Sequence, residues 1–153
     1  MTMWDTKTML EQIESELEKL ILPDFSVDEE LIFDKLYHYG KVELQTLLLL
    51  YAQQKAYLEE EKAKRETFIK VQQGAYDDNY YVTLYEVCQE YQNNKIKKPP
   101  QEELKAEIIS KNENLRNINK NIVIDYAVLS RINSWLEKVT TQYYTTKDFL
   151  NRQ

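Results

Sequence analysis

Apolar residues recur at intervals of three and four positions along most of this chain, with charged residues between them. This spacing places the apolar side chains on one face of an α-helix, so it predicts a largely helical protein. The first predicted helix spans residues 4–22 and ends before Pro23, which cannot continue a helix. Its apolar face consists of Met9, Leu10, Ile13, Leu17, Leu20 and Ile21.

A second, longer helix is predicted to begin at Ser26, because a serine followed three residues later by Glu29 forms a capping box. Apolar residues continue at helical spacing over residues 31–69. Gly40 either bends or interrupts this helix. Gly74 is expected to end it, because glycine is common just after the C-terminus of a helix.

Residues 75–98 form the least regular part of the pattern. The tyrosine, aspartates and asparagine at residues 76–79 predict a loop. Residues 81–91 fit a short helix, although their valine, threonine and tyrosine content also suits a strand. We favour the helix. Residues 92–100 are polar and end in two prolines, so we expect a linker there.

The last predicted helix follows Pro99 and Pro100 and covers residues 101–146. A continuous helix of this size would be roughly 70 Å long, whereas a compact domain of about 150 residues has a radius of gyration near 15 Å. We therefore expect the helix either to break, near Asp125, or to project and pair with another chain. Asp125 is the one polar position in a narrow seam that is otherwise made of Leu115, Ile118, Ile122, Leu129, Ile132, Leu136, Val139 and Tyr143.

The second half of this seam carries large apolar side chains where a single subunit has least to pack against them, and such clusters usually mark an interface. The residues expected to hold an oligomer together are Leu129, Ile132, Trp135, Leu136, Val139 and Tyr143. The predicted fold class is all-α, with long helices packed as a helical hairpin or bundle in a single domain over residues 1–153. Two glycines and three prolines leave too few tight turns for a β-sandwich or barrel.

Histidine and cysteine are scarce, and the acids are plentiful but form no pair that is distinguished by its spacing. The chain has one histidine, His38, and one cysteine, Cys88, so neither an intrachain disulfide nor a zinc site is expected. Neither glycine lies in a phosphate-binding loop. We therefore expect no catalytic residue, metal or cofactor, and an enzyme that uses His38 is the least favoured hypothesis. No apolar run reaches the roughly 18 residues of a membrane span, and no signal peptide is expected, which indicates a cytoplasmic protein without a membrane partner.

The net charge of −6 is distributed unevenly. Residues 1–60 hold 13 acidic and 5 basic residues, a net charge of −8, whereas residues 61–75 hold 2 acidic and 4 basic residues, a net charge of +2. The candidate DNA-binding residues in and beside this basic stretch are Lys55, Lys62, Lys64, Arg65 and Lys70. Aromatic residues lie among them, and such a mixture can bind single-stranded nucleic acid through phosphate pairing and base stacking. The alternative is a solvated helix face whose bases pair with nearby glutamates.

The order of these elements resembles that of the UvsY-type recombination mediators of T4-like phages. The likeness begins with the acidic helix at residues 10–19, LEQIESELEK, and an apolar and acidic turn at residues 21–28. A long helix then ends in the basic stretch KAKR at residues 62–65, shortly before a glycine. A long C-terminal helix over residues 102–150 completes the pattern, so the resemblance covers most of the chain.

The resemblance implies a small, all-helical, non-catalytic protein in the cytoplasm of an infected bacterial host, assembled as a ring of six or seven subunits. It implies three partners: single-stranded DNA, the phage recombinase and the phage single-strand-binding protein. The implied function is to promote loading of the recombinase onto a strand covered by single-strand-binding protein, and Lys62, Lys64 and Arg65 match the type of the family's DNA-binding motif. The alternative function is a helical protein–protein adaptor or coiled-coil assembly factor that binds no nucleic acid.

Overall fold

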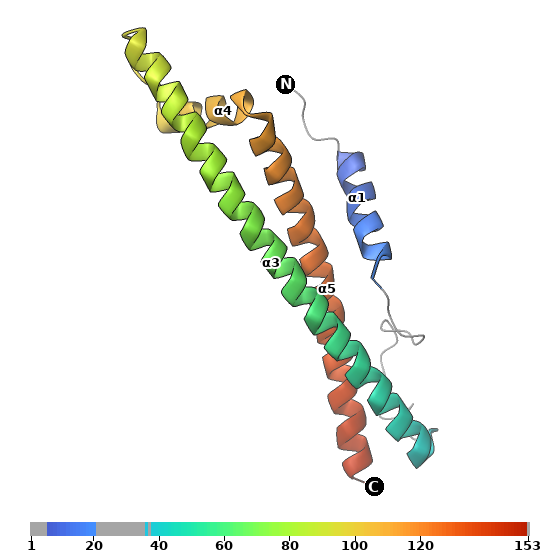
Figure 1. Cartoon of the computed structure of the whole chain (residues 1–153). Helices are drawn as coiled ribbons and strands as arrows, with labels where there is room; N and C mark the ends of the chain where they lie inside the picture. Colours follow the sequence, from blue (N-terminus) through green and yellow to red (C-terminus); the bar gives the residue numbers. More distant parts are fainter. Residues whose placement is uncertain (1–5, 21–35, 37, 153) are drawn as a thin grey trace. The chain divides into compact units, whose positions relative to one another are not determined.

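The computed structural model describes residues 6–20, 36 and 38–152 of the chain. These residues form four α-helices and no β-strand: α1 (Thr6–Glu18), α3 (Lys41–Asn93), α4 (Gln101–Lys111) and α5 (Glu113–Asn151) (Figure 1). The predicted all-α fold is confirmed for this part of the chain.

Helix α1 lies within the first predicted helix. Met9, Ile13 and Leu17 are half-buried, as the spacing of the apolar residues predicts, but Leu10 of the predicted apolar face is exposed. The predicted helix stop at Pro23 and the capping box at residues 26–29 lie outside the described residues.

Helix α3 begins at Lys41, directly after Gly40. The backbone carbonyl of Gly40 accepts a helical hydrogen bond of 2.9 Å from the N–H of Leu44. Gly40 therefore interrupts the predicted helix rather than bending it. The first turn of α3 places Leu44 in a buried cluster with Leu36 and Phe149.

Two predictions for the second half of α3 were wrong. The helix does not end at Gly74, and residues 76–79 are not a loop, because α3 continues without a break to Asn93. A glycine inside a helix costs only about 0.5–1 kcal/mol. Burial of a single apolar side chain such as Val87 contributes about 1.5–3 kcal/mol, so packing outweighs the glycine. The favoured helix over residues 81–91 is confirmed.

Helix α3 ends in a Schellman motif, in which the residue after the helix turns into the left-handed region. Lys95 occupies this position with a φ of 55°. Its N–H donates to the carbonyl of Gln92 (3.2 Å), and the N–H of Ile96 donates to the carbonyl of Tyr91 (3.0 Å). These bonds satisfy carbonyl groups that the end of the helix leaves without helical partners. The non-helical residues 94–100 lie within the predicted linker.

The C-terminal segment consists of two helices that meet at Asn112. The extended backbone of Asn112 (φ −121°, ψ 103°) separates α4 from α5. Its Oδ1 accepts a hydrogen bond from the backbone N–H of Leu115 (3.2 Å), which caps α5, and its Nδ2 donates to Oγ1 of Thr83 (2.8 Å). The predicted break near Asp125 was wrong, because Asp125 lies inside α5.

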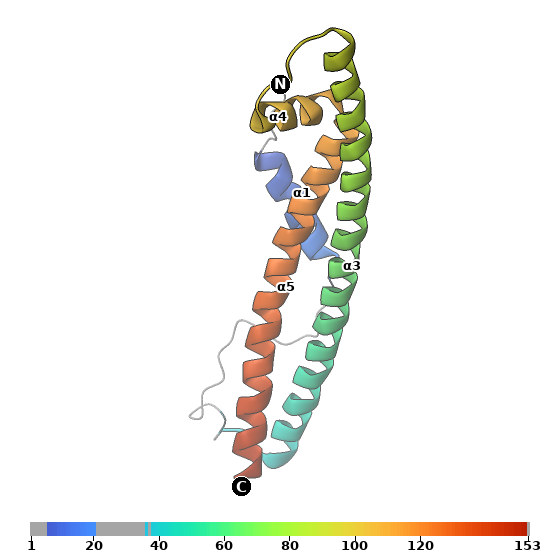
Figure 2. The same ribbon diagram turned by 90° about the vertical axis from the view of Figure 1, so that its left-hand side faces the viewer.

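The chain divides into two compact units. The first unit contains Met1–Glu14 and Thr67–Ala127, and the second unit contains Ser15–Glu66 and Val128–Gln153. Within each unit, segments of α3 and α5 lie side by side and run in opposite directions in both views (Figures 1 and 2). Each unit therefore contains the helical hairpin packing that the sequence predicts.

Each unit has its own hydrophobic core. In the first unit, Val87 of α3, Ile108 of α4 and Leu115 of α5 are buried together. The half-buried residues packed against this cluster are Tyr76, Tyr80, Leu84, Tyr91 and Leu104. In the second unit, Leu150 packs against the cluster of Leu36, Leu44 and Phe149.

Candidate nucleic-acid interface

The predicted DNA-binding residues divide between the two units. Lys55, Lys62, Lys64 and Arg65 belong to the second unit, and the exposed Lys70 belongs to the first. The five residues are therefore not assembled into one site within either unit.

The charge of Lys64 is offset by acidic residues one turn away on α3. Its Nζ lies 3.6 Å from the carboxylate of Glu60 and 3.4 Å from that of Glu61. The hydrogen bond to Glu61 raises the pKa of Lys64. A DNA phosphate at this position would have to displace these carboxylates.

Arg65 connects α3 with α1 inside the second unit. Its side chain is only 12% exposed, and its guanidinium lies 3.4 Å from the carboxylate of Glu16. Glu16 also accepts a 2.9 Å hydrogen bond from Lys19, which is the largest cause of its lowered pKa, while Arg65 contributes less. Arg65 therefore packs α1 against α3 instead of presenting its charge to solvent.

Lys55 lies in a groove with residues of α5, which the sequence patterns did not connect to it. The groove has a volume of about 310 Å³. It is lined from α3 by Ala52, Lys55, Ala56 and Glu59, and from α5 by Tyr143, Tyr144 and Lys147. We call these seven residues the tyrosine–lysine groove.

The aromatic and basic side chains of the tyrosine–lysine groove contact one another. The Nζ of Lys147 lies 5.9 Å from the centroid of the Tyr143 ring, within the range of a cation–π interaction. The rings of Tyr143 and Tyr144 meet edge to face, with centroids 5.2 Å apart and planes at 81°. Tyr144 is half-exposed. The Nζ of Lys55 lies 3.3 Å from the carboxylate of Glu59.

Helical spacing explains why these residues form a groove. Residues 52, 55, 56 and 59 are three and four positions apart, so they share one face of α3, and residues 143 and 147 share one face of α5. The short side chains of Ala52 and Ala56 leave space that larger residues would fill. The tyrosines and lysines therefore border an open depression instead of a closed helix contact.

The part of α5 that contributes to the groove is locally basic. Residues 128–153 contain four bases and two acids, a net charge of +2 on a chain of net charge −6. Local potential, rather than the total charge, guides a polyanion to a surface. The sequence analysis did not assign Tyr143, Tyr144 or Lys147 to DNA binding, and it placed Tyr143 in the oligomer seam; the available signal was a pair of tyrosines with a lysine four positions after Tyr143.

A second groove, of about 510 Å³, lies in the first unit. Its lining residues are Tyr76, Asp77, Tyr80, Tyr81, Gln101, Glu102 and Lys105. The rings of Tyr76 and Tyr80 stack, with centroids 6.2 Å apart and planes at 20°, and burial raises the pKa of Tyr76. Two carboxylates and one lysine make this groove unfavourable for phosphate, so it is a poorer nucleic-acid site.

The residues predicted to hold the oligomer together lie on α5 in the second unit. Ile132 and Val139 have no exposed surface within the single chain. Leu129, Trp135, Leu136 and Tyr143 are half-buried. Much of this seam is therefore already covered within the single chain, and its role between copies stays a prediction.

Metal-ligating side chains are not grouped in the part of the chain that the structure describes. Among residues 6–20, 36 and 38–152, no group of three or more His, Cys, Asp or Glu side chains is placed to hold a metal ion. His38 is exposed in the second unit, and Cys88 is half-buried in the first. None of the described helices combines the length and apolar character needed to cross a membrane.

Comparison with known proteins assigns no family. No protein-family model, curated protein or solved structure matches the chain. The chemistry of the tyrosine–lysine groove and of the exposed helix faces is therefore what points to a function.

Proposed function

We propose that this protein is a non-catalytic recombination mediator, which binds single-stranded DNA and helps a recombinase to replace single-strand-binding protein on the strand. The observation that carries the proposal is the tyrosine–lysine groove. Lysine ammonium groups pair with phosphates, and tyrosine rings stack on bases of any sequence. A mediator needs this kind of sequence-independent binding because it acts on any strand.

The tyrosine–lysine groove is a better candidate than the basic stretch at residues 62–65. Lys64 and Arg65 lie against carboxylates, which DNA would have to displace, and Lys55 of the groove is likewise paired with Glu59. Lys147 lies over an aromatic ring instead, and both Tyr143 and Tyr144 are beside it. The groove therefore offers charge and stacking surface together.

Binding of a fluorescent single-stranded oligonucleotide, measured by anisotropy at several salt concentrations, tests the groove. Replacing Lys147 by alanine should weaken binding and reduce the log–log salt slope by about 0.7, the value for one phosphate contact on a single strand. Replacing Tyr144 by alanine should weaken binding by about 1–3 kcal/mol without changing that slope, because only stacking is lost.

Lys64→Ala is the matched control, since it removes the same charge from the same unit at a position that is already paired. The control should bind like the parent. The groove assignment is wrong if Lys147→Ala and Tyr144→Ala bind like the parent, or if Lys64→Ala alone weakens binding. Far-ultraviolet circular dichroism of each variant verifies that the helices are intact.

A second candidate function, a helical protein–protein adaptor, is supported by exposed apolar residues on α3 of the first unit. Phe68, Val71, Val82 and Tyr85 are all exposed. A parent protein that binds no single-stranded DNA at low salt, yet associates with itself or another protein, would favour the adaptor. Restored recombinase activity on DNA covered by single-strand-binding protein would favour the mediator.

A further inference from the structure

A row of exposed apolar side chains follows α3 in the first unit. Phe68, Val71, Val82 and Tyr85 are 53–67% exposed. Together with Ala75 and Asp78, which lie between Val71 and Val82, these four residues follow a three–four repeat, the spacing of a coiled-coil seam. We call this row the outer stripe; its members are Phe68, Val71, Ala75, Asp78, Val82 and Tyr85.

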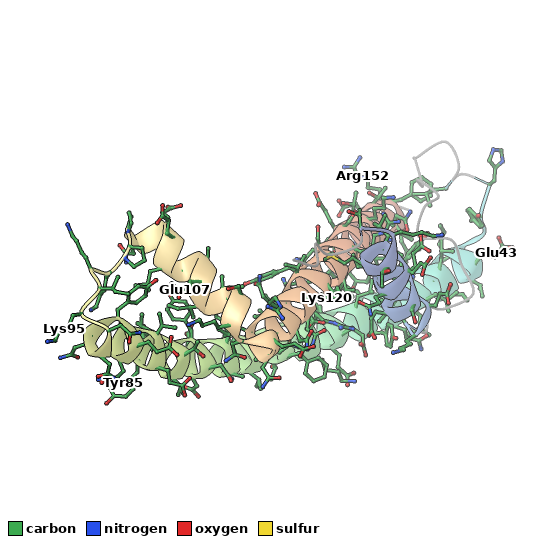
Figure 3. All side chains as sticks on the ribbon, turned by 90° about the horizontal axis from the view of Figure 1, so that it is seen from above. Glu43, Tyr85, Lys95, Glu107, Lys120 and Arg152 are labelled. Atoms are coloured by element: carbon green, nitrogen blue, oxygen red, sulfur yellow. The ribbon has the colours of Figure 1, made fainter. Side chains whose placement is uncertain are left out.

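The outer stripe lies on the side of α3 that faces away from the core of the first unit. Ile69, Thr83 and Val87 are buried on the inner side of the same helix. Figure 3 shows Tyr85 pointing away from α4, which lies on the opposite side of α3. The first unit thus buries one face of α3 and leaves most of the surface of the outer stripe to solvent.

We propose that the outer stripe is a self-association surface, on which a second copy of this chain docks with its own outer stripe in the antiparallel direction. In this pairing Phe68 faces Tyr85 of the second copy, and Val71 faces Val82. Ala75 faces Asp78. Every position of the stripe then meets another position of the same stripe, as a two-fold contact requires.

The charges of the outer stripe select the antiparallel direction. A parallel pairing would place Asp78 directly against Asp78 of the second copy, and two like charges in contact are unfavourable. The antiparallel pairing places each Asp78 beside the small Ala75 and one turn away from its counterpart. It also brings Lys70 to within two residues of the level of Tyr81 of the second copy, a distance that the long lysine side chain can span to lie over the ring.

The exposed area of the outer stripe is sufficient for a specific contact. A buried aromatic side chain contributes about 150–250 Å², so the exposed parts of Phe68 and Tyr85 in the outer stripe, and of Tyr81 on its flank, amount to roughly 100–150 Å² each. Two copies of these three residues would bury roughly 600–900 Å². The valines and polar flanks bring the total to the roughly 1,000 Å² that specific interfaces need.

Cysteine crosslinking tests the direction and register. In a Cys88→Ser background, the double variant Val71→Cys/Val82→Cys should form covalent dimers with a short bifunctional maleimide. Val71→Cys alone should not, because in the antiparallel pair the two copies of residue 71 are about 16 Å apart along the helix axis. Crosslinking of Val71→Cys alone, or none with the double variant, overturns the proposal.

Light scattering coupled to gel filtration tests the surface itself. Val71→Asp should lower the dimer fraction at least tenfold, whereas Val42→Asp, which changes another exposed valine of α3, should leave it unchanged. Asp78→Asn should strengthen the dimer, because it removes the residual repulsion. A monomeric parent, a Val71→Asp variant that dimerises like the parent, or an Asp78→Asn variant that dimerises less contradicts the proposal. These outcomes are distinct from loss of DNA binding, which is measured with the variants of the tyrosine–lysine groove.

Discussion

The side-chain amide of Gln72 donates a 2.8 Å hydrogen bond to the carboxylate of Asp125, and so links α3 with α5 inside the first unit. Asp125 is only 7% exposed. In the sequence, Asp125 is the one polar residue in an otherwise apolar seam, and we therefore predicted that the helix could break there. The structure instead places a hydrogen-bond donor opposite its carboxylate, which offsets the cost of burying this polar side chain inside α5.

Replacing Asp125 by alanine should lower the free energy of unfolding by about 1–3 kcal/mol, because the amide of Gln72 loses a charged acceptor in a largely buried setting. Urea denaturation of the parent and the variant measures this difference. Asp148→Ala removes an exposed acid from the same helix and should change stability little. Equal effects of the two substitutions would show that the contact with Gln72 contributes nothing.

Asn112→Ala should destabilise the junction of α4 and α5 by about 1–2 kcal/mol, because the side chain that caps α5 is lost. The same substitution removes the hydrogen bond to Thr83. Asn117→Ala, at an exposed position one turn further along α5, is the control and should be nearly neutral. A urea midpoint equal to that of the parent would contradict the capping role.

Gly74→Ala should raise the free energy of unfolding by about 0.5–1 kcal/mol, because alanine loses less backbone freedom than glycine in a helix. Gly74 lies within α3, and an added Cβ would meet no atom within 4 Å. Gly40→Ala should bring no such gain, since residue 40 precedes the helix, where glycine is preferred to alanine. The comparison of the two melting temperatures checks both statements.

Lys95→Gly should also stabilise the protein, by about 1 kcal/mol. Here glycine is the better residue, because position 95 has a left-handed backbone instead of a helical one. Lys95 adopts a φ of 55°, a conformation that costs an ordinary residue about 1–2 kcal/mol but suits glycine. Lys97→Gly, a change in the same linker outside the Schellman motif, should give no gain. Thermal unfolding that is unchanged in Lys95→Gly would argue against this turn geometry.

Stability should depend on the ionisation of Glu16. The hydrogen bond from Lys19 and the neighbouring Arg65 lower the pKa of Glu16 below the ordinary glutamate value of about 4.3. A carboxylate with a lowered folded-state pKa stabilises the protein above the unfolded value, and this contribution is lost as the pH falls through the folded value. Glu16→Gln should therefore be less stable than the parent at pH 7, and the difference should shrink below about pH 4.

Melting temperatures of the parent and Glu16→Gln between pH 3 and pH 7 measure this convergence. Glu14→Gln replaces an exposed acid on the same helix and should follow the parent at every pH. A difference between Glu16→Gln and the parent that stays constant over this range would mean that the ion pair with Arg65 carries no pH dependence.

The spacing of apolar residues predicted which segments are helical, but it did not predict where the helices end. The three–four spacing of apolar residues predicted α1, most of α3 and α5. It does so because a helix on the surface of a folded protein buries one apolar face against the core. The stop at Gly74 failed because glycine is only weakly unfavourable, while Tyr76, Tyr80 and Val87 supply a core face beyond it. The break at Asn112 was not predicted, although asparagine is a common helix cap and its bond to Leu115 is local. Its second hydrogen bond, to Thr83, joins residues remote in sequence, which no local pattern indicates.

The sequence by itself determined that the described part of the chain is helical and that histidine and cysteine occur only once each, since spacing and composition suffice for both. Only the tertiary structure decided which residues far apart in the chain become neighbours. The pairing of Lys64 with Glu61, one turn away, matches the alternative that the sequence offered, whereas the pairing of Arg65 with the distant Glu16 has no local signal. Lys55 acquires Tyr143, Tyr144 and Lys147 as neighbours. The physical reason is that the pairing of α3 with α5 brings together residues far apart in the chain, and no local pattern encodes that register.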